Sequence, residues 1–364
     1  MTTKSFPLAS LIVILMGILL TNSAGFNENN SRLTTSCTST SQCITFDLEI
    51  PNIETSELIV NDIKYASFAI EGEGCTYDHD RPMLPAISRF VVVPPRDGLD
   101  LVYHSSEPQR FDISEPVVLC RDEDLTTSPF PLLAYGGVRQ HGYYPPVIAE
   151  MSEPFIIRGV RLVKVTTYPI QYNPATGEYF HREHITAEIR STKEAPVNPV
   201  EHLLRHNRSR VFLDFIEALA INGDQVRRDQ PDDEAPEYVG HYLVVTHENC
   251  LQYAAPFIEW RRKAGYKVEI LSLSANNAGD EEFVSDAIQE IYDDYLDDGI
   301  DPFDFLLLIG DRTQHQYGPN AQWILNAESG VSIWGNPPHA DYEYACLEGR
   351  DDHHPDVGFA RWPN

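Results

Sequence analysis

An alternation of apolar strands and amphipathic helices between Tyr238 and Asp311 constrains the fold more than any other feature of the chain. Three short runs are rich in aliphatic and β-branched residues, which is typical of strands buried in a sheet. The segments between them carry the caps, terminal charges and terminating glycines of helices. The strands are predicted at His241–His247, Lys267–Leu273 and Phe305–Ile309, and the helices at Pro256–Ala264 and from the N-cap Asp280 to Gly299, with Val284, Ile288, Ile291 and Tyr295 on the apolar face. This order implies right-handed crossovers and a parallel sheet covered on both faces.

A series of short motifs follows in order through this region and towards the last residue. The motifs are His241–His247, Ala255–Trp260, Lys263–Val268, Phe305–Asp311, Asp341–Tyr344, Gly349–Asp352, Pro355–Val357 and Gly358–Arg361. In this order they resemble the opening of the peptidase domain of gingipain-type cysteine peptidases, family C25. The resemblance implies that residues 237–364 are the α/β N-terminal subdomain of such a peptidase, caspase-like or flavodoxin-like, and that this subdomain is incomplete.

The first residues have the organisation of a secretory signal peptide. Lys4 precedes an apolar run from Phe6 to Leu20, and small residues follow up to a cleavage site near Ala24. The run is too short to span a bilayer, and no second run is long enough. Residues 1–24 are therefore predicted to be removed, which leaves a secreted or cell-surface protein without a membrane span.

Between about Cys43 and Thr192 the pattern changes to short alternating strands punctuated by proline and glycine. The predicted strands are Cys43–Ile50, Arg89–Val93, Ile156–Thr167, Gln171–Tyr179 with a turn at Asn173–Gly177, and Ile185–Ile189. Such spacing is typical of an all-β sandwich, which we expect at residues 25–195. The chain is thus predicted to be multi-domain.

This β-rich region also carries an ordered set of motifs: Leu84–Phe90, Val93–Pro95, Tyr143–Pro145, Arg158–Arg161 and Pro169–Glu178. They resemble the propeptide of the gingipain-type family. The resemblance implies an intramolecular chaperone and inhibitor that covers the active-site cleft until it is cut away. An ordinary sandwich adhesion module is the alternative.

Residues 196–236 are expected to link the two domains, with a short helix at Phe212–Leu219. After Arg227 and Arg228 comes a polar, proline-flanked run, and exposed chain of this kind is where proteases cut. Activating cleavage after Arg227 or Arg228 is one hypothesis. An uncut linker, whose arginines balance neighbouring acids, is the other.

No catalytic residue is assigned within the chain. A cysteine peptidase needs a thiolate activated by an imidazole and N–H groups that hold the oxyanion. The resemblance implies a histidine followed tens of residues later by a cysteine, and no such element follows Asp311, so the dyad is expected beyond Asn364. Two local pairs were weighed, and structural roles are favoured for both: Cys250 with His247, and Cys346 with His353 or His354.

The other cysteines and the acidic residues suggest little further chemistry. Six cysteines show no zinc spacing, and Cys37 and Cys43 are near enough for a small disulfide loop whose pairing the sequence leaves open.

Oxygen ligands for Ca²⁺ are available in one acidic, loop-rich segment, and the resemblance implies calcium bound for stability. A solvated acidic loop is the favoured alternative. The candidate calcium ligands are Asp341, Asp351, Asp352 and Asp356, with Glu343 nearby.

Charge and family resemblance together limit the function. A net charge of −28 argues against nucleic acid or an anionic membrane as a partner, because both need cationic surface. The predicted function is a secreted cysteine endopeptidase zymogen acting on protein or peptide substrates, with contact between propeptide and peptidase. An inactive binding or cell-surface module and a sortase-like transpeptidase remain open as alternatives.

Overall fold

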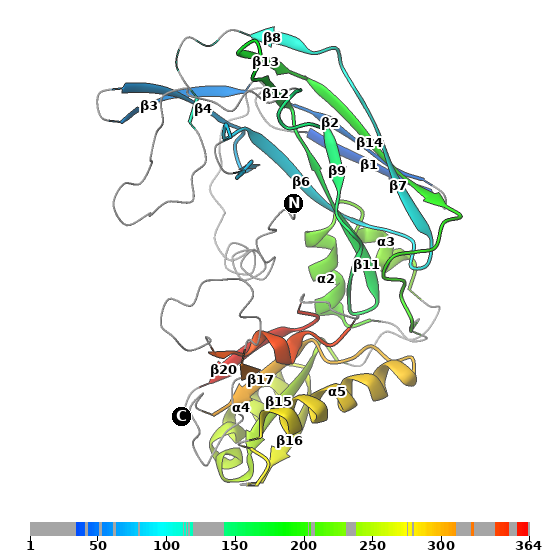
Figure 1. Ribbon diagram of the computed structural model, residues 1–364. Coiled ribbons are helices and arrows are strands. Elements are labelled where there is room, and N and C mark those ends of the chain that lie inside the picture. The colour runs from blue at the N-terminus through cyan, green and yellow to red at the C-terminus, as the bar shows by residue number, and fades with distance from the viewer. Residues whose placement is uncertain are drawn as a thin grey trace.

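The chain folds into a strand-rich N-terminal part and an α/β C-terminal part, seen above and below one another in the computed structural model (Figure 1). We call residues 34–230 the N-terminal part and residues 238–362 the C-terminal part. The structure describes residues 34–40, 43–50, 53–60, 63–78, 81–111, 113, 115, 117–118, 142–202, 204, 208–230, 238–274, 276–278, 280–310, 322–323, 339–348 and 355–362.

Two antiparallel sheets of the N-terminal part share one hydrophobic core. Phe46, Leu48, Val91, Val163 and Ile185, which come from both sheets, have almost no solvent exposure. The first sheet has the order β1 (Thr34–Ser39), β2 (Cys43–Glu49), β14 (His184–Thr192) and β7 (Gly98–Ser105). The second has the order β10 (Phe155–Ile157), β11 (Val160–Thr167), β6 (Pro85–Val92) and β5 (Gly74–Cys75), with β9 (Ala149–Met151) also on β11.

Smaller strand groups complete the N-terminal part. The turn predicted at Asn173–Gly177 joins two of these strands, and its Asn173 Oδ1 accepts the Ala175 N–H at 3.0 Å. Gly177 has a φ of 75°, which glycine adopts without strain. The remaining strands are β12 (Ile170–Asn173), β13 (Glu178–His181) and β8 (Gln109–Phe111) in one sheet, and the pair β3 (Glu54–Val60) and β4 (Ile63–Ala69) in another.

The short helix predicted in the linker is present and packs on the N-terminal part. It is α2 (Arg210–Leu219), and a further short helix, α3 (Asp224–Arg228), follows it. Phe212 and Ile216 of α2 lie in one apolar cluster with Ile157 and Leu162 of the β10–β11 hairpin. The hairpin tip and α2 therefore form one unit, and this unit reaches down to the C-terminal part (Figure 1).

A four-stranded parallel sheet forms the C-terminal part, as the alternating pattern predicts. Its order is β16 (Lys267–Leu273), β15 (His241–His247), β17 (Phe305–Ile309) and β20 (Gly358–Trp362). The helix α4 (Leu251–Lys263) packs on one face, and α5 (Glu281–Asp297) packs on the other. Short elements complete this part: η1 (Glu248–Cys250), β18 (Gln322–Trp323), β19 (His339–Ala340) and η3 (Tyr342–Ala345).

The structure matches all three strands predicted here and corrects the helices. Helix α4 begins at Leu251, five residues before the predicted start at Pro256, which lies inside the helix. The most buried face of α5 includes Tyr292 and Leu296, whereas the predicted Ile291 and Tyr295 are only partly buried. Within the described residues, no helix is long and apolar enough to cross a membrane.

Candidate functional site

The two parts meet through one deeply buried arginine at the tip of the β10–β11 hairpin. Arg158 and Gly159 form the two-residue turn, and both have positive φ, 47° and 68°. This is the backbone form that two-residue hairpin turns favour. The turn brings the side chain of Arg158, 1% exposed, into the C-terminal part.

Two aspartates just before β17 receive the Arg158 guanidinium. Its Nη2 lies 2.6 Å from Asp301 Oδ2 and donates to the Pro302 carbonyl at 2.7 Å, while its Nη1 pairs with Asp304. The group also stacks over the Phe212 ring of α2, 4.5 Å from the ring centre. Burial alone would lower the pKa of Arg158, but the carboxylates of Asp301 and Asp304 more than offset it and raise that pKa.

A second arginine and the helix cap of α2 complete this cluster from the N-terminal part. Arg208 donates to the Arg158 carbonyl and lies 3.5 Å from Asp301 Oδ1. The Ser209 N–H donates to Asp301 at 2.8 Å, and the Ser209 hydroxyl donates to Asp304. All five groups are buried, and most of their hydrogen bonds and ion pairs are made with one another, although Arg158 Nε and Asp301 Oδ1 have no hydrogen-bond partner among the described residues.

A pair of carboxyl groups lies on the other side of the hairpin tip. Glu348 Oε2 accepts the Gly159 N–H at 2.7 Å, and Asp356 Oδ1 accepts the Arg158 N–H at 3.3 Å. Burial and the neighbouring Glu348 raise the pKa of Asp356, and burial also raises the pKa of Glu348. Each carboxyl group thus holds a backbone N–H of the hairpin turn.

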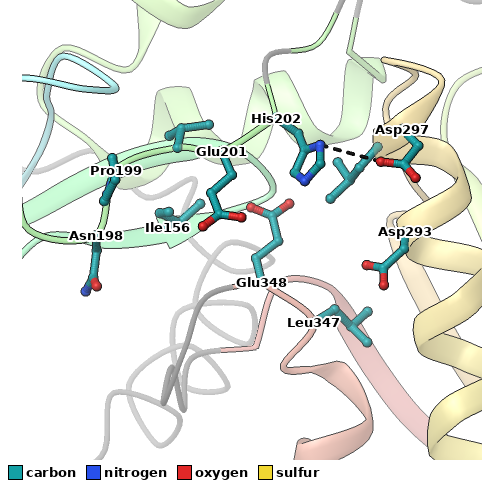
Figure 2. A pocket seen from close by; sticks show the side chains of 11 residues that line it. Ile156, Asn198, Pro199, Glu201, His202, Asp293, Asp297, Leu347 and Glu348 are labelled. Atoms are coloured by element: carbon teal, nitrogen blue, oxygen red, sulfur yellow. Dashed lines mark ion pairs between the residues drawn. The ribbon is translucent and has the colours of Figure 1, made fainter.

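An open cavity of about 720 Å³ borders this contact (Figure 2). Ile156 and residues 198–202 line it from the N-terminal part, and α5 and Glu348 line it from the C-terminal part. His202 Nδ1 lies 3.7 Å from Asp297 Oδ1 across the cavity. Figure 2 shows Glu348 extending from the C-terminal part towards the 198–202 segment.

The buried contact lies at the amino-terminal edge of the parallel sheet. Asp304 directly precedes β17, its carboxylate accepts the N–H of His241 at the start of β15, and its carbonyl accepts the N–H of Gly358 at the start of β20. Catalytic and ligand sites of open α/β sheets lie at the opposite, carboxyl-terminal edge.

At that opposite edge, His247 and Cys250 have structural surroundings. His247 is the last residue of β15, and its Nδ1 accepts the Asn249 N–H at 3.0 Å, which caps the short η1 helix. Cys250 is 6% exposed and belongs to the apolar cluster of Ala254 and Ile258 on α4. A capping imidazole and a buried thiol agree with the structural roles favoured for this pair.

The second local pair can be followed only at its cysteine. Cys346 donates its thiol hydrogen to the Tyr342 carbonyl at 3.4 Å, just after η3. Its proposed partners, His353 and His354, lie outside the described residues.

Comparison with known families assigns both parts of the chain. Residues 26–219, more than half of the chain, match the family model Propeptide_C25, and residues 235–364 match the model of peptidase family C25. The chain belongs to the gingipain-type peptidase family C25. It is a precursor that holds propeptide and peptidase sequence in that order.

Curated relatives of this C25 chain are gingipains of Porphyromonas gingivalis. Gingipain R2 of strain ATCC BAA-308 / W83 is 26% identical over 237 residues, which cover 64% of this chain and 31% of the relative. Gingipain R1 is also 26% identical over 237 residues, covering 64% of this chain and 23% of the relative. The chain thus spans about a third or less of the length of these relatives.

Two solved gingipain structures resemble parts of the C25 chain. A complex of the pro- and mature domains of RgpB from P. gingivalis has 18% identity and a TM-score of 0.44, covering 53% of this chain and 98% of that one. A structure addressing the zymogenic latency of gingipain K, from the same organism, has 19% identity and a TM-score of 0.37, covering 44% of this chain and 93% of that one.

The candidate calcium ligands of the C25 chain do not converge where the structure describes them. Asp341 pairs with Arg361 at 2.6 Å, and both Asp356 oxygens accept backbone N–H groups. Asp351 and Asp352 lie outside the described residues. Among the residues that the structure does describe, no group of three or more His, Cys, Asp or Glu side chains could hold a metal ion. Calcium binding by this segment stays a prediction.

The proposed cleavage residues of the precursor are placed in part. Arg227 and Arg228 are in the last turn of α3, where Arg227 pairs with Asp214 and Glu217, and Arg228 with Asp224. Pairing with neighbouring acids is what the hypothesis of an uncut linker predicts, and cleavage after Arg227 or Arg228 stays a prediction. Ala24 and residues 231–237 lie outside the described residues.

The cysteines give no disulfide where they are described. Cys37 and Cys43, the two cysteines of the expected small loop, are both free thiols, as is Cys75. Burial raises the pKa of the Cys37 thiol, and the nearby Asp224 adds to this effect.

The interface itself was not predicted from the sequence. Arg158 entered only as part of a propeptide-like motif, and Asp301 and Asp304 were not singled out. A usable signal was present: an Arg-Gly pair between two apolar runs predicts a hairpin whose tip carries a cation. Its partners, more than 140 residues away in sequence, carry no local mark of the pairing.

Proposed function

We propose that this chain is the precursor form of a secreted cysteine endopeptidase, in which the N-terminal part contains the propeptide that chaperones and inhibits the peptidase. The observation that carries the proposal is the order of the two family matches on one chain, with the matched parts in buried contact through Arg158. The propeptide unit is taken as residues 25–195, the linker as residues 196–236, and the peptidase subdomain as residues 237–364.

The finer architecture belongs to the same proposal. A shared core under two antiparallel sheets supports a β-sandwich for the propeptide. A parallel sheet with helices on both faces supports the first half of a caspase-like peptidase. The propeptide-like domain is proposed to cover the active-site cleft, although the described contacts between the parts lie at the other edge of the sheet.

The chemistry proposed is acyl transfer through a thiolate. A cysteine thiolate, activated by a histidine, attacks the scissile carbonyl, and N–H groups stabilise the oxyanion that forms. The described residues supply the sheet whose carboxyl-terminal edge would carry the reacting groups.

Activation is proposed to follow a cut in the segment between α3 and β15. That segment joins a helix packed on the propeptide to the first strand of the peptidase subdomain. A cut there separates the two matched regions without breaking either described core. The signal peptide, removed near Ala24, would direct the precursor out of the cytoplasm.

The test is activity of the complete gene product before and after limited proteolysis. We expect thiol-dependent cleavage of fluorogenic peptides to appear once the linker is cut, with a new N-terminus between residues 228 and 238, and the propeptide fragment has been separated or degraded. Iodoacetamide should abolish the activity. Peptidase freed of its propeptide that shows no thiol-dependent activity would overturn the proposal, and transfer to an added amine nucleophile would identify a transpeptidase instead.

A further inference from the structure

A cluster of four carboxyl groups at the amino-terminal edge of the sheet accounts for most of the polar contact between the two parts. Asp301, Asp304, Glu348 and Asp356 all belong to the C-terminal part, and all contact the tip of one hairpin from the N-terminal part. Two of them bind the guanidinium of Arg158, and two bind backbone N–H groups of the turn. The cluster therefore contacts both the side chain and the backbone of the turn.

We propose that these four carboxyl groups form a docking site specific for an arginine at the tip of a tight β-hairpin, and that this site holds the propeptide on the peptidase independently of the catalytic edge. The proposal rests on the function proposed above, because it names the surface through which the propeptide is held. Its consequence is that cutting the linker does not by itself release the propeptide.

The geometry selects arginine over lysine. Asp301, Asp304 and the Pro302 carbonyl are reached by two nitrogens of one planar group. A guanidinium presents five N–H donors in a fixed fork and stacks on aromatic rings, as Arg158 does on Phe212. An ammonium is a single charged point that cannot bridge both aspartates and stack at once.

The turn conformation adds a second element of recognition. The Arg158 and Gly159 N–H groups are directed to Asp356 and Glu348 because both residues have positive φ. An extended peptide with an arginine would not present these two N–H groups together. The partner that fits is therefore a hairpin, and the hairpin of this chain fills the site.

Charge distribution favours the same pairing. The sequence from Glu237 to Asn364 has 23 acidic residues against 7 lysines and arginines. The two buried cations that enter this acidic part, Arg158 and Arg208, both come from the N-terminal part. In the joined state these two arginines offset the charges of Asp301 and Asp304, which are both buried there.

The experiment uses the full chain with the recognition sequence of a site-specific protease in place of residues 231–236. The folded chain is cut, and the dissociation constant of the two fragments is measured by sedimentation. We expect wild-type fragments to stay together, Arg158→Lys to weaken them at least about tenfold, and Arg158→Met at least about a hundredfold.

Arg161→Lys is the matched control. Arg161 lies on the same hairpin and is equally buried, but its guanidinium donates to the carbonyls of Pro94, Asp97 and Val197 within the N-terminal part. Its loss should lower the stability of the N-terminal part and leave the dissociation constant within about threefold of wild type. Circular dichroism of each variant checks that the β-rich part is folded.

Asp301→Asn supplies a test from the other partner. An asparagine keeps an acceptor for the Ser209 N–H and removes the charge opposite Arg158. In a double-mutant cycle with Arg158→Met, the two losses should be strongly non-additive. Arg158 variants that bind as tightly as wild type, or wild-type fragments that separate once cut, would overturn the docking site. Neither result bears on peptidase activity, which is tested separately on the complete gene product.

Discussion

His241 shows how a single buried residue makes stability depend on pH. It begins β15 without any exposed surface, and its ring lies edge-on to Tyr295 and Phe303. Neither ring nitrogen has a hydrogen-bond partner among the described residues, and Glu269 Oε2 lies 3.4 Å from Nε2. Burial, Lys267 and Arg158 together lower the pKa of His241 to about 3.

Replacing His241 should therefore make the free energy of unfolding depend less on pH in mild acid. The unfolded chain binds a proton near pH 6.5, whereas the folded chain does not until about pH 3, so stability is present above pH 6.5 and is lost as the pH falls. The loss should reach about 2 kcal/mol at pH 5. His241→Phe should remove it in urea unfolding measured from pH 5 to 7.5. Exposed His104→Gln is the control, and an unchanged slope in His241→Phe would contradict the assignment.

At the scale of elements, two helix caps differ in what they connect. Asp280 caps α5 by accepting the Phe283 N–H at 3.1 Å, a local contact. Ser209 caps α2 by accepting the Phe212 N–H at 3.1 Å, and it also donates to Asp304 in the other part of the chain. The Asp280 cap thus stabilises α5 alone, whereas the Ser209 cap stabilises α2 and also contacts the C-terminal part.

The two caps should differ in energetic cost when each is replaced by alanine. Asp280→Ala should lower the free energy of unfolding by about 1 kcal/mol, the usual value for a lost N-cap. Ser209→Ala should cost about 2 to 3 kcal/mol, because it also leaves a buried carboxylate without one donor. Guanidinium unfolding of both variants measures the difference. Equal costs would show that the Ser209 contact with Asp304 adds nothing.

At the scale of the whole molecule, the placement of the interface separates docking from chemistry. The two parts join at the amino-terminal edge of the sheet, while His247 and Trp362 end β15 and β20 at the other edge. Docking at this edge is therefore separate from the covering of the active-site cleft that is proposed for the propeptide. The cavity beside Glu348 brings solvent to the rim of the contact (Figure 2).

Association of the two parts should weaken as the pH rises. Burial raises the pKa of Glu348, although the charges of Arg158 and Arg208 act in the opposite direction. Burial and the neighbouring Glu348 raise the pKa of Asp356. The joined state therefore holds protons that the separated carboxyl groups, with ordinary pKa values near about 4, release. Contact is strongest on the acid side and is lost as the pH passes the raised values.

Glu348→Gln tests this dependence with the hydrogen bonds kept. Its amide can still accept the Gly159 N–H and can donate to Tyr292, which now donates to Glu348. Above neutral pH the two fragments of the variant should associate more tightly than those of wild type. Between pH 6 and 8.5 the dissociation constant of the variant should change less than that of wild type, by a factor of at least about three. Sedimentation of the cut chain across this range measures it. Tighter wild-type association at higher pH would refute the argument.

Sequence patterns alone predicted most of the local elements of the C-terminal part. The strands β15, β16 and β17 begin and end where predicted, and Asp280 caps α5, because strand alternation and helix caps act within a few residues. The exceptions also have local causes. The sequence predicts the start of α4 at Pro256 because proline is tolerated in the first turn of a helix, whereas in the fold it is the sixth residue of α4.

Tertiary structure decided the interface and the roles of its charged groups. Arg158 and Asp304 are 146 residues apart, and the sequence around either residue does not predict that the two will pair. The same holds for β20, which is a strand because β17 offers it an edge. Asp356, predicted as a calcium ligand, accepts backbone N–H groups in the fold. The physical reason is that burial and charge pairing depend on which distant segments meet, whereas strands and caps depend on neighbours in the chain.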